Sequence, residues 1–476
     1  MSTVTSSTPP TSAGAGRPWP GDDFADWLPP MLVRELRQGI QSGAFFWTFL
    51  LLQGALVLHA AFTVLGSSGA FDGPLGRTSG GFFWTILVVS VVLVIPLRGL
   101  QAVAHERVGN NLDLVRLTRL SATRIVVGKW AALVAQVLLV TAAILPYLVL
   151  RYFIGGVNVV GELGRLGWLV VAAAVVAALA VYASTRPQRE RVGLMALVVF
   201  GGWGSLMGIM TRGGFVGATP GWFGLGVAAL YATLLLDAAA ASIAPASENR
   251  AFWRRLLGLG CAAAVATAGL FGGPADFVPI AVALGLPVLV LVVGAVCERP
   301  VRFRRLHAAF ARGGIVGRLA AAVLTPGWAT GLVFAALAGG LTAIGFLAQA
   351  APIQPVMAAC VSLVAAAVVF PLPLLLAFPK VKERATLYVA VQAVCLVIFG
   401  IDAFVRGMPG SSRNTLAIVV PFPLAGLLRL FADGTAAATL FLAGLVVLAI
   451  VLAILARPWW REMRETQRLV GSGTRP

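Results

Sequence analysis

The residue types that most often perform chemistry are few in this sequence and far apart. Its three histidines, His59, His105 and His307, stand on separate segments, and neither HExxH nor GxSxG occurs. The pair Gly128-Lys129 is followed by Trp and lacks the upstream glycine of GxxxxGK[ST], so it cannot grip nucleotide phosphates in the usual way. The four cysteines lie in or beside apolar runs without CxxC spacing, which indicates small buried side chains. We therefore predict no catalytic residue, no metal site and no cofactor bound by this chain.

A second group of polar residues interrupts long apolar runs, where charge is costly in hydrocarbon and must face protein or water. These candidates for a transport pathway are Gln53, His59, Asp237 and Asp402. Two interpretations stay open for Asp237, a substrate contact or a salt bridge with Arg250 or Arg254 near the membrane boundary. Gln136 and Gln392 are expected to form hydrogen bonds between helices.

The composition shows which elements must position these residues. Of the 476 residues, 59% are hydrophobic and only 11% are charged. So large an apolar surface cannot be buried in the cores of soluble domains. Apolar runs of about 20 residues recur, the length that crosses roughly 30 Å of hydrocarbon as a helix. Only helices satisfy their backbone internally at that depth in such a chain, so we predict an all-α, polytopic membrane protein.

The apolar runs predict about twelve spans in two groups of six. The first group is expected at residues 43–65, 81–97, 126–150, 166–184, 194–211 and 222–243. The second is expected at 257–271, 277–297, 321–347, 355–378, 385–405 and 435–456. The corresponding domains are a disordered tail at 1–28, an interfacial helix at 29–41, a first six-span half at 42–256, a second half at 257–456 and a C-terminal tail at 457–476.

The basic residues predict the orientation of these spans. The net charge of +18 comes from Lys and Arg in short loops, where the positive-inside rule accounts for it without nucleic acid. With the N-terminus in the cytosol, 29 of the 36 Lys and Arg residues fall on the cytosolic side and 7 outside, so both termini are predicted to be cytosolic. Residues 414–434 are also apolar, but a thirteenth span would send the Arg-rich C-terminus outward. We interpret them as an external hairpin broken by Pro421 and Pro423, with a full span as the alternative.

Residues 29–41 predict a short amphipathic helix in the cytosolic interface. Its apolar side chains fall within an arc of roughly 100° and are Leu32, Val33, Leu36 and Ile40. The polar side chains on the opposite side are Arg34, Glu35, Arg37 and Gln38. Either a topological anchor or a mechanical role fits this helix.

The cytosolic loop at 98–129 is far longer than a turn needs and mixes both charge signs with leucines. Ser121 is placed to cap the helix that re-enters the membrane, with Arg124 and Lys129 at the interface. A docking surface for a soluble partner and a solvated charged loop are both open interpretations.

These two stretches, RELRQGI before the first span and AHERVGNNLDLVRLTRLSATRIVVGK after the second, resemble the permease subunits of type-2 ABC exporters. The family pattern is a Glu-Arg pair, a leucine-rich stretch ending near Thr or Ser, and Gly-Lys at the next span. It falls here on Glu106, Arg107, Leu114, Leu117, Thr118, Ser121, Gly128 and Lys129. The resemblance covers about residues 31–255; one departure is Asn110-Asn111, where the family often has Gly-Thr after the Glu-Arg pair.

The resemblance implies that 29–41 is an elbow helix and that the 98–129 loop carries a coupling helix seated on a separate ATPase. The implied ATPase contacts are Glu106, Arg107, Asn111, Asp113, Leu114, Arg116, Leu117 and Arg119. It also implies that ATP and Mg are bound by that partner, that the permease works as a homodimer or with a second permease, and that it sits in lipid in the bacterial inner membrane. The alternatives are an ion-coupled secondary transporter, for which mid-membrane charges are few, and a non-transporting scaffold.

Overall fold

The structure is a computed structural model in which part of the chain is described. The described residues are 30–67, 75–101, 121–154, 158–188, 191, 221–244, 249–303, 307, 310–349, 354–378, 384, 387–394, 423 and 437–472. Within these ranges helices are the only regular secondary structure, as the apolar runs predicted. Ten of the described helical segments are long and apolar enough to cross a membrane, so the chain is a multi-pass helical membrane protein.

Ten of the twelve predicted spans coincide with these helices. The other two, 194–211 and 385–405, lie wholly or largely outside the described residues, as does 414–434 apart from Pro423. The count of twelve and the cytosolic position of the termini therefore stay predictions. So does the division into two halves of six spans.

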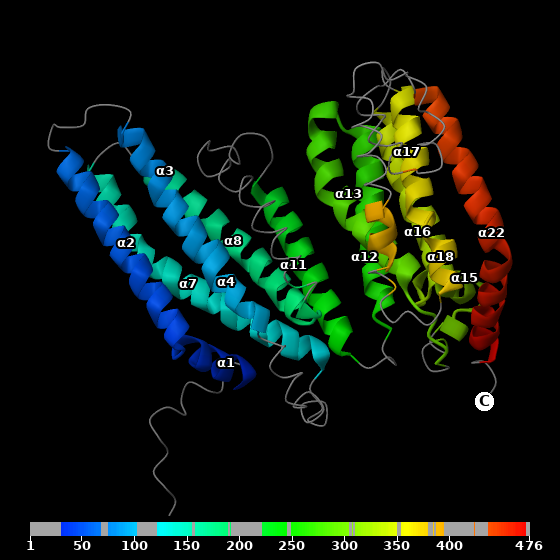
Figure 1. Ribbon diagram of the computed structural model, residues 1–476, viewed down its shortest axis with the longest axis horizontal. Helices are drawn as coiled ribbons and strands as arrows, with labels where there is room; N and C mark the ends of the chain where they lie inside the picture. Colours follow the sequence, from blue (N-terminus) through cyan, green and yellow to red (C-terminus); the bar gives the residue numbers. More distant parts are fainter. Residues whose placement is uncertain are drawn as a thin grey trace, which may run out of the picture. The chain divides into compact units, whose positions relative to one another are not determined.

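By internal contacts the chain divides into two units whose boundary falls within one helix, α11 (Gly221–Ile243). Unit 1 comprises the described residues of 30–191 and the end of α11. Its helices are α1 (Pro30–Ile40), α2 (Gly43–Ser67), α3 (Leu75–Leu87), η2 (Val88–Val94), α4 (Ile95–Leu97), η3 (Arg98–Gln101), α7 (Ala122–Ile154) and α8 (Val159–Ser184). Figure 1 shows α1 lying across the end of the helices that follow it in this unit.

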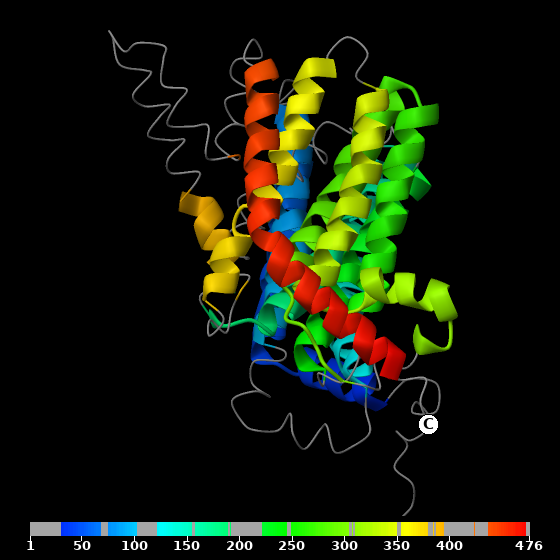
Figure 2. The ribbon, with the colours of Figure 1, turned by 90° about the vertical axis from the view of Figure 1, so that its right-hand side faces the viewer.

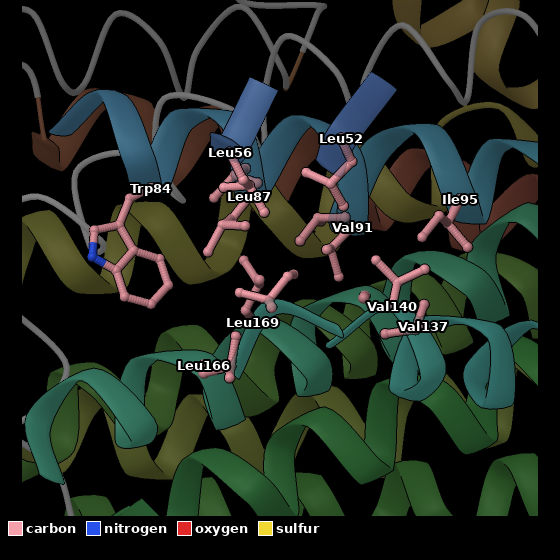
Figure 3. Close-up of a cluster of buried hydrophobic side chains, with 14 of the residues drawn as sticks. Leu52, Leu56, Trp84, Leu87, Val91, Ile95, Val137, Val140, Leu166 and Leu169 are labelled. Atoms are coloured by element: carbon pink, nitrogen blue, oxygen red, sulfur yellow. The ribbon is translucent and has the colours of Figure 1, made fainter. Parts of the chain in front are cut away.

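The core of unit 1 consists of aliphatic side chains that pack between α2, α7, α8 and the continuous helical segment α3–η2–α4. We call these four helical segments rods. Figure 3 shows these side chains pointing toward one another. They include Leu52, Leu56, Leu87, Val91, Ile95, Val137, Val140 and Leu169. In lipid the hydrophobic effect does not drive helices together, so dispersion contacts of this kind must hold the rods in place.

The second predicted span contains a π-helical stretch, η2, immediately before Pro96. The Ile95 N–H donates to the Ser90 carbonyl oxygen, five residues back. Proline lacks an N–H and its ring crowds the carbonyl four residues earlier, so the chain widens its turn beside Pro96. The distortion of the second span beside Pro96 is thus a π-turn.

Unit 2 contains most of α11 and the described residues from 244 onward. Its other helices are α12 (Ala251–Phe271), α13 (Pro274–Cys297), α15 (Gly314–Leu324), α16 (Trp328–Ala348), α17 (Gln354–Val369), α18 (Leu372–Ala377) and α22 (Ala437–Ser472). The helices α12, α13 and α16 pack on one another, and α17 packs on α22. Figure 2 shows α22 turning in its lower half and running obliquely toward α15.

The structure corrects two predicted boundaries in unit 2. The predicted span at 321–347 is instead α15, a corner at Thr325–Gly327, and α16, because Pro326 disfavours a helical residue before it and Gly327 has φ 145°. The predicted C-terminal tail is not a separate segment, since α22 continues through Pro458 to Ser472. Its last turns are rich in Glu, Arg and Gln, which favour helix outside the membrane as well.

Candidate functional site

The candidate site of unit 1 is a polar cluster at the corner between α1 and α2. Ser42 forms this corner: its hydroxyl donates to the Gly39 carbonyl oxygen at 2.7 Å and accepts from the Phe45 N–H at 3.3 Å. The second of these bonds caps the N-terminus of α2. Ser42 therefore fixes the direction in which the chain enters its first span.

Arg98, at the end of the second span, joins α1 to α7. Its guanidinium donates to the Gln136 side-chain oxygen and to the Gly39 carbonyl oxygen, both at 3.1 Å, and to the Ser42 hydroxyl. The guanidinium carbon also lies 5.5 Å from the centre of the Phe45 ring. The planar fork of arginine suits such a site because one charge can serve several acceptors at fixed angles.

Gly39 allows the close approach of α1 to α7. A Cβ at this position would lie 2.1 Å from the Gln136 amide nitrogen, well inside van der Waals contact. The absent side chain thus leaves the Gly39 carbonyl within reach of Arg98 and keeps Gln136 beside it.

Lys129 and Glu35 form the second fastening between α7 and α1, with Nζ and Oε1 2.9 Å apart. The Lys129 side chain is 4% exposed and that of Glu35 is 23% exposed. A charge as buried as Lys129 needs a partner, because removal of one partner from a buried pair leaves an uncompensated charge. The lysine predicted at the membrane interface is therefore a buried anchor for α1.

These two fastenings lie at the two ends of the segment predicted to dock a partner. Arg98 stands in η3, which ends at Gln101, and Lys129 stands two turns inside α7, which begins at Ala122. The Arg124 N–H donates to Ser121 Oγ at 3.3 Å, as predicted for a cap. The predicted ATPase contacts lie outside the described residues, and all of them belong to the intervening 102–120: Glu106, Arg107, Asn111, Asp113, Leu114, Arg116, Leu117 and Arg119.

On α1 itself the structure separates residues that the sequence grouped together. Arg34 and Arg37 are exposed, as predicted, but Glu35 turns toward α7. Ile40, on the predicted apolar side, is 37% exposed. The geometry differs because Glu35 is drawn to the ammonium of Lys129, an attraction that helical periodicity alone does not reveal.

Of the predicted pathway residues, Gln53 and His59 lie in α2 of unit 1. His59 is buried beside Phe82 and Phe83, with ring centres 6.0 and 5.7 Å away. The Nε2 atoms of His59 and Gln53 have no hydrogen-bond partner among the described residues. Asp402 lies outside the described residues.

Asp237 forms the predicted salt bridge. Its carboxylate lies 3.0 Å from Arg254 Nε and 3.7 Å from Arg250 Nη1. The predicted interhelical hydrogen bonds are also present: Gln136 accepts from Arg98, and Gln392 donates to the Ala367 carbonyl oxygen at 2.7 Å.

Sequence reasoning missed a buried arginine that organises unit 2. Arg255 is 2% exposed and lies 2.6 Å from Glu298 Oε2. It also donates to the Val323 and Gly327 carbonyl oxygens, at 2.7 and 3.1 Å, and to Thr330 Oγ1 at 3.0 Å. Arg255 thus holds the corner between α15 and α16, whereas its sequence position marked only a membrane boundary.

Comparison with known proteins identifies no relative: no family model matches the chain, and neither a curated protein nor a solved structure matches it. Among the described residues no group of three His, Cys, Asp or Glu side chains could hold a metal ion. The polar cluster of Glu35, Gly39, Ser42, Arg98, Lys129 and Gln136, which we name the elbow cluster, is therefore described by its geometry alone.

Proposed function

We propose that the chain is the membrane-spanning permease subunit of an ATP-driven exporter in the bacterial inner membrane. A separate ATP-binding cassette ATPase would dock on the 98–129 loop and bind ATP and Mg. The permease would act as a homodimer or beside a second permease. The sequence pattern from the elbow helix to Gly128-Lys129 motivates this proposal.

The observation that supports it best is the way α1 is fastened to both helices that flank 102–120. Arg98 binds Gly39 from the end of the second span, and Lys129 binds Glu35 from the start of the third. If a partner bound at 102–120 displaces either of these helices, their contacts with α1 would move α1 as well. Rigid elements joined by buried polar contacts can transmit such a displacement into the membrane.

The test is to purify the full-length chain from native membranes in mild detergent and to measure vanadate-sensitive ATP hydrolysis in the complex. We expect an ATPase subunit to co-purify, and Glu106→Ala/Arg107→Ala to abolish ATP-driven transport while the chain still folds and reaches the membrane. The matched control is Arg34→Ala/Arg37→Ala, which removes exposed charges from α1 and should keep the ATPase bound.

Two results would contradict the proposal. One is transport by the Glu106→Ala/Arg107→Ala variant at the wild-type rate with the ATPase still bound. The other is transport in ATP-depleted vesicles under an imposed proton or sodium gradient, which would identify a secondary transporter instead.

A further inference from the structure

In unit 2, α15 and the C-terminal part of α22, residues 457–472, form a surface to which the proposed function assigns no role. We propose that this surface, which we name the α15–α22 platform, binds the headgroups of anionic phospholipids. The inference rests on the membrane character of the chain and not on the proposed function.

The platform lies at the membrane boundary. The first 20 residues of α22, 437–456, contain no charged side chain, and at 1.5 Å per residue they cross about 30 Å, the thickness of the hydrocarbon. Arg457 therefore marks the boundary, followed by the Trp459-Trp460 pair that is typical of an interface. Trp459 Nε1 donates to the Ala329 carbonyl oxygen at 3.0 Å, so the start of α16, one corner away from α15, lies at the same level.

On α15 an aliphatic ridge points away from the protein. Gly317 and Ala321 are buried against the bundle, whereas Ile315, Val316 and Leu319 are 77%, 75% and 66% exposed. Three large aliphatic side chains exposed on one helix at the membrane boundary are typical of a helix that lies in the interface with its apolar side in the acyl layer.

On α22 a basic stripe lies opposite the packed face. Successive helical residues are about 100° apart, so four exposed arginines fall within an arc of about 60°: Arg457, Arg461, Arg464 and Arg468. Trp459 and Met463 project from the other side into the core of unit 2. None of the four guanidinium groups forms a salt bridge with a carboxylate in the described part of the chain, since Glu462 and Glu465 both pair with Arg302.

The ridge and the stripe are joined. Gln467 Nε2 donates to the Arg318 carbonyl oxygen at 3.2 Å, which sets α15 against the part of α22 that carries Arg464 and Arg468. Arg464 also lies over the exposed ring of Trp460, with its guanidinium carbon 5.0 Å from the ring centre. Guanidinium groups without a carboxylate partner in the described residues, on a helix that contacts one with exposed aliphatic side chains, fit a ligand that has an anionic head and an apolar tail.

An acidic protein surface is the competing occupant. An acidic surface would pair with the arginines. It would not explain why Ile315, Val316 and Leu319 are exposed at the membrane boundary. Each basic residue near an anionic bilayer surface contributes about 1 kcal/mol to binding, so removal of two arginines has a measurable effect.

The test titrates the delipidated full-length protein in neutral detergent with phosphatidylglycerol and with phosphatidylcholine, and counts bound lipids by native mass spectrometry. We expect preferential binding of phosphatidylglycerol and a loss of roughly 30-fold in its affinity in Arg464→Gln/Arg468→Gln. The control Arg34→Gln/Arg37→Gln removes the same charge from exposed positions on α1 and should leave this site unaffected. Inorganic phosphate at the same concentration as the headgroups should not compete, because it lacks the tail.

A second variant tests the ridge. Val316→Asn/Leu319→Asn keeps every arginine and, because both side chains are exposed, should keep the fold; we expect it to weaken phosphatidylglycerol binding as well. Equal binding of both lipids by the wild type would overturn the proposal, as would an equal loss in the α1 control. Unchanged lipid binding in Arg464→Gln/Arg468→Gln would also overturn it, and if that variant also lost an acidic protein partner, the surface would be a protein dock.

Discussion

The buried pair of Lys129 and Glu35 predicts that its two charges are not equally costly to remove. Glu35→Gln removes an acidic partner from an ammonium that is 4% exposed, whereas Lys129→Met leaves a carboxylate that is 23% exposed and can turn to water. Loss of one partner from a buried ion pair costs about 3–5 kcal/mol, and a pair open to solvent on one side falls at the lower end. We therefore expect about 3 kcal/mol for Glu35→Gln and about 1 kcal/mol for Lys129→Met.

The double variant Glu35→Gln/Lys129→Met removes both charges and should recover most of the loss, because an apolar side chain replaces the buried ammonium. The assay is a double-mutant cycle on thermal unfolding of the purified protein in detergent. Arg34→Gln, on the exposed side of the same helix, serves as the control and should change stability by less than about 0.5 kcal/mol. Additive effects of the two single substitutions, or a larger loss for Lys129→Met, would refute this account of the pair.

Three further substitutions test close packing and buried charge. Gly39→Ala should destabilise the protein by about 1–3 kcal/mol because its Cβ would meet the Gln136 side chain, and Gln136→Ala in the same molecule should restore part of the loss in a thermal melt. Gly269→Ala should destabilise the protein by about 3 kcal/mol or more because its Cβ would lie 2.2 Å from a backbone oxygen of α16. The control is Gly260→Ala on the same helix, whose Cβ would meet no atom within 4 Å. It should leave membrane yield and melting temperature unchanged. Arg255→Met should cost about 3–5 kcal/mol, measured as the loss of folded protein by size-exclusion chromatography.

The sequence predicts those features of the fold that follow from the thickness of the hydrocarbon, which sets the length of each spanning helix. Runs such as 277–297 have one interpretation, because about 20 apolar residues in succession fit a membrane and little else. The corner at Thr325–Gly327 was harder, since the apolar residues on both sides of Pro326 conceal a change of direction. The helix beyond Arg457 was missed because charge indicates where the membrane ends, not where the helix ends.

The elbow cluster was predictable only in outline. The amphipathic pattern of 29–41 and the cap at Ser121 depend on neighbours in sequence, and both appear in the structure. The contacts of Arg98 with Gly39 and of Lys129 with Glu35 join residues 59 and 94 positions apart, which local periodicity does not reveal. Proximity to a predicted membrane boundary made both cations look like topological signals, and their contacts became evident only from the packing of α1 on α7.

The π-turn beside Pro96 also determines where Arg98 points. A π-turn closes over five residues where an α-turn closes over four. If η2 tightened into an ordinary helix, the chain after it would swing by about 100° around the rod axis, the angle that one residue occupies. Arg98 would then leave Gly39 and Ser42 although nothing near those two residues had changed. The winding of the second span thus decides whether the first span stays attached to its neighbours.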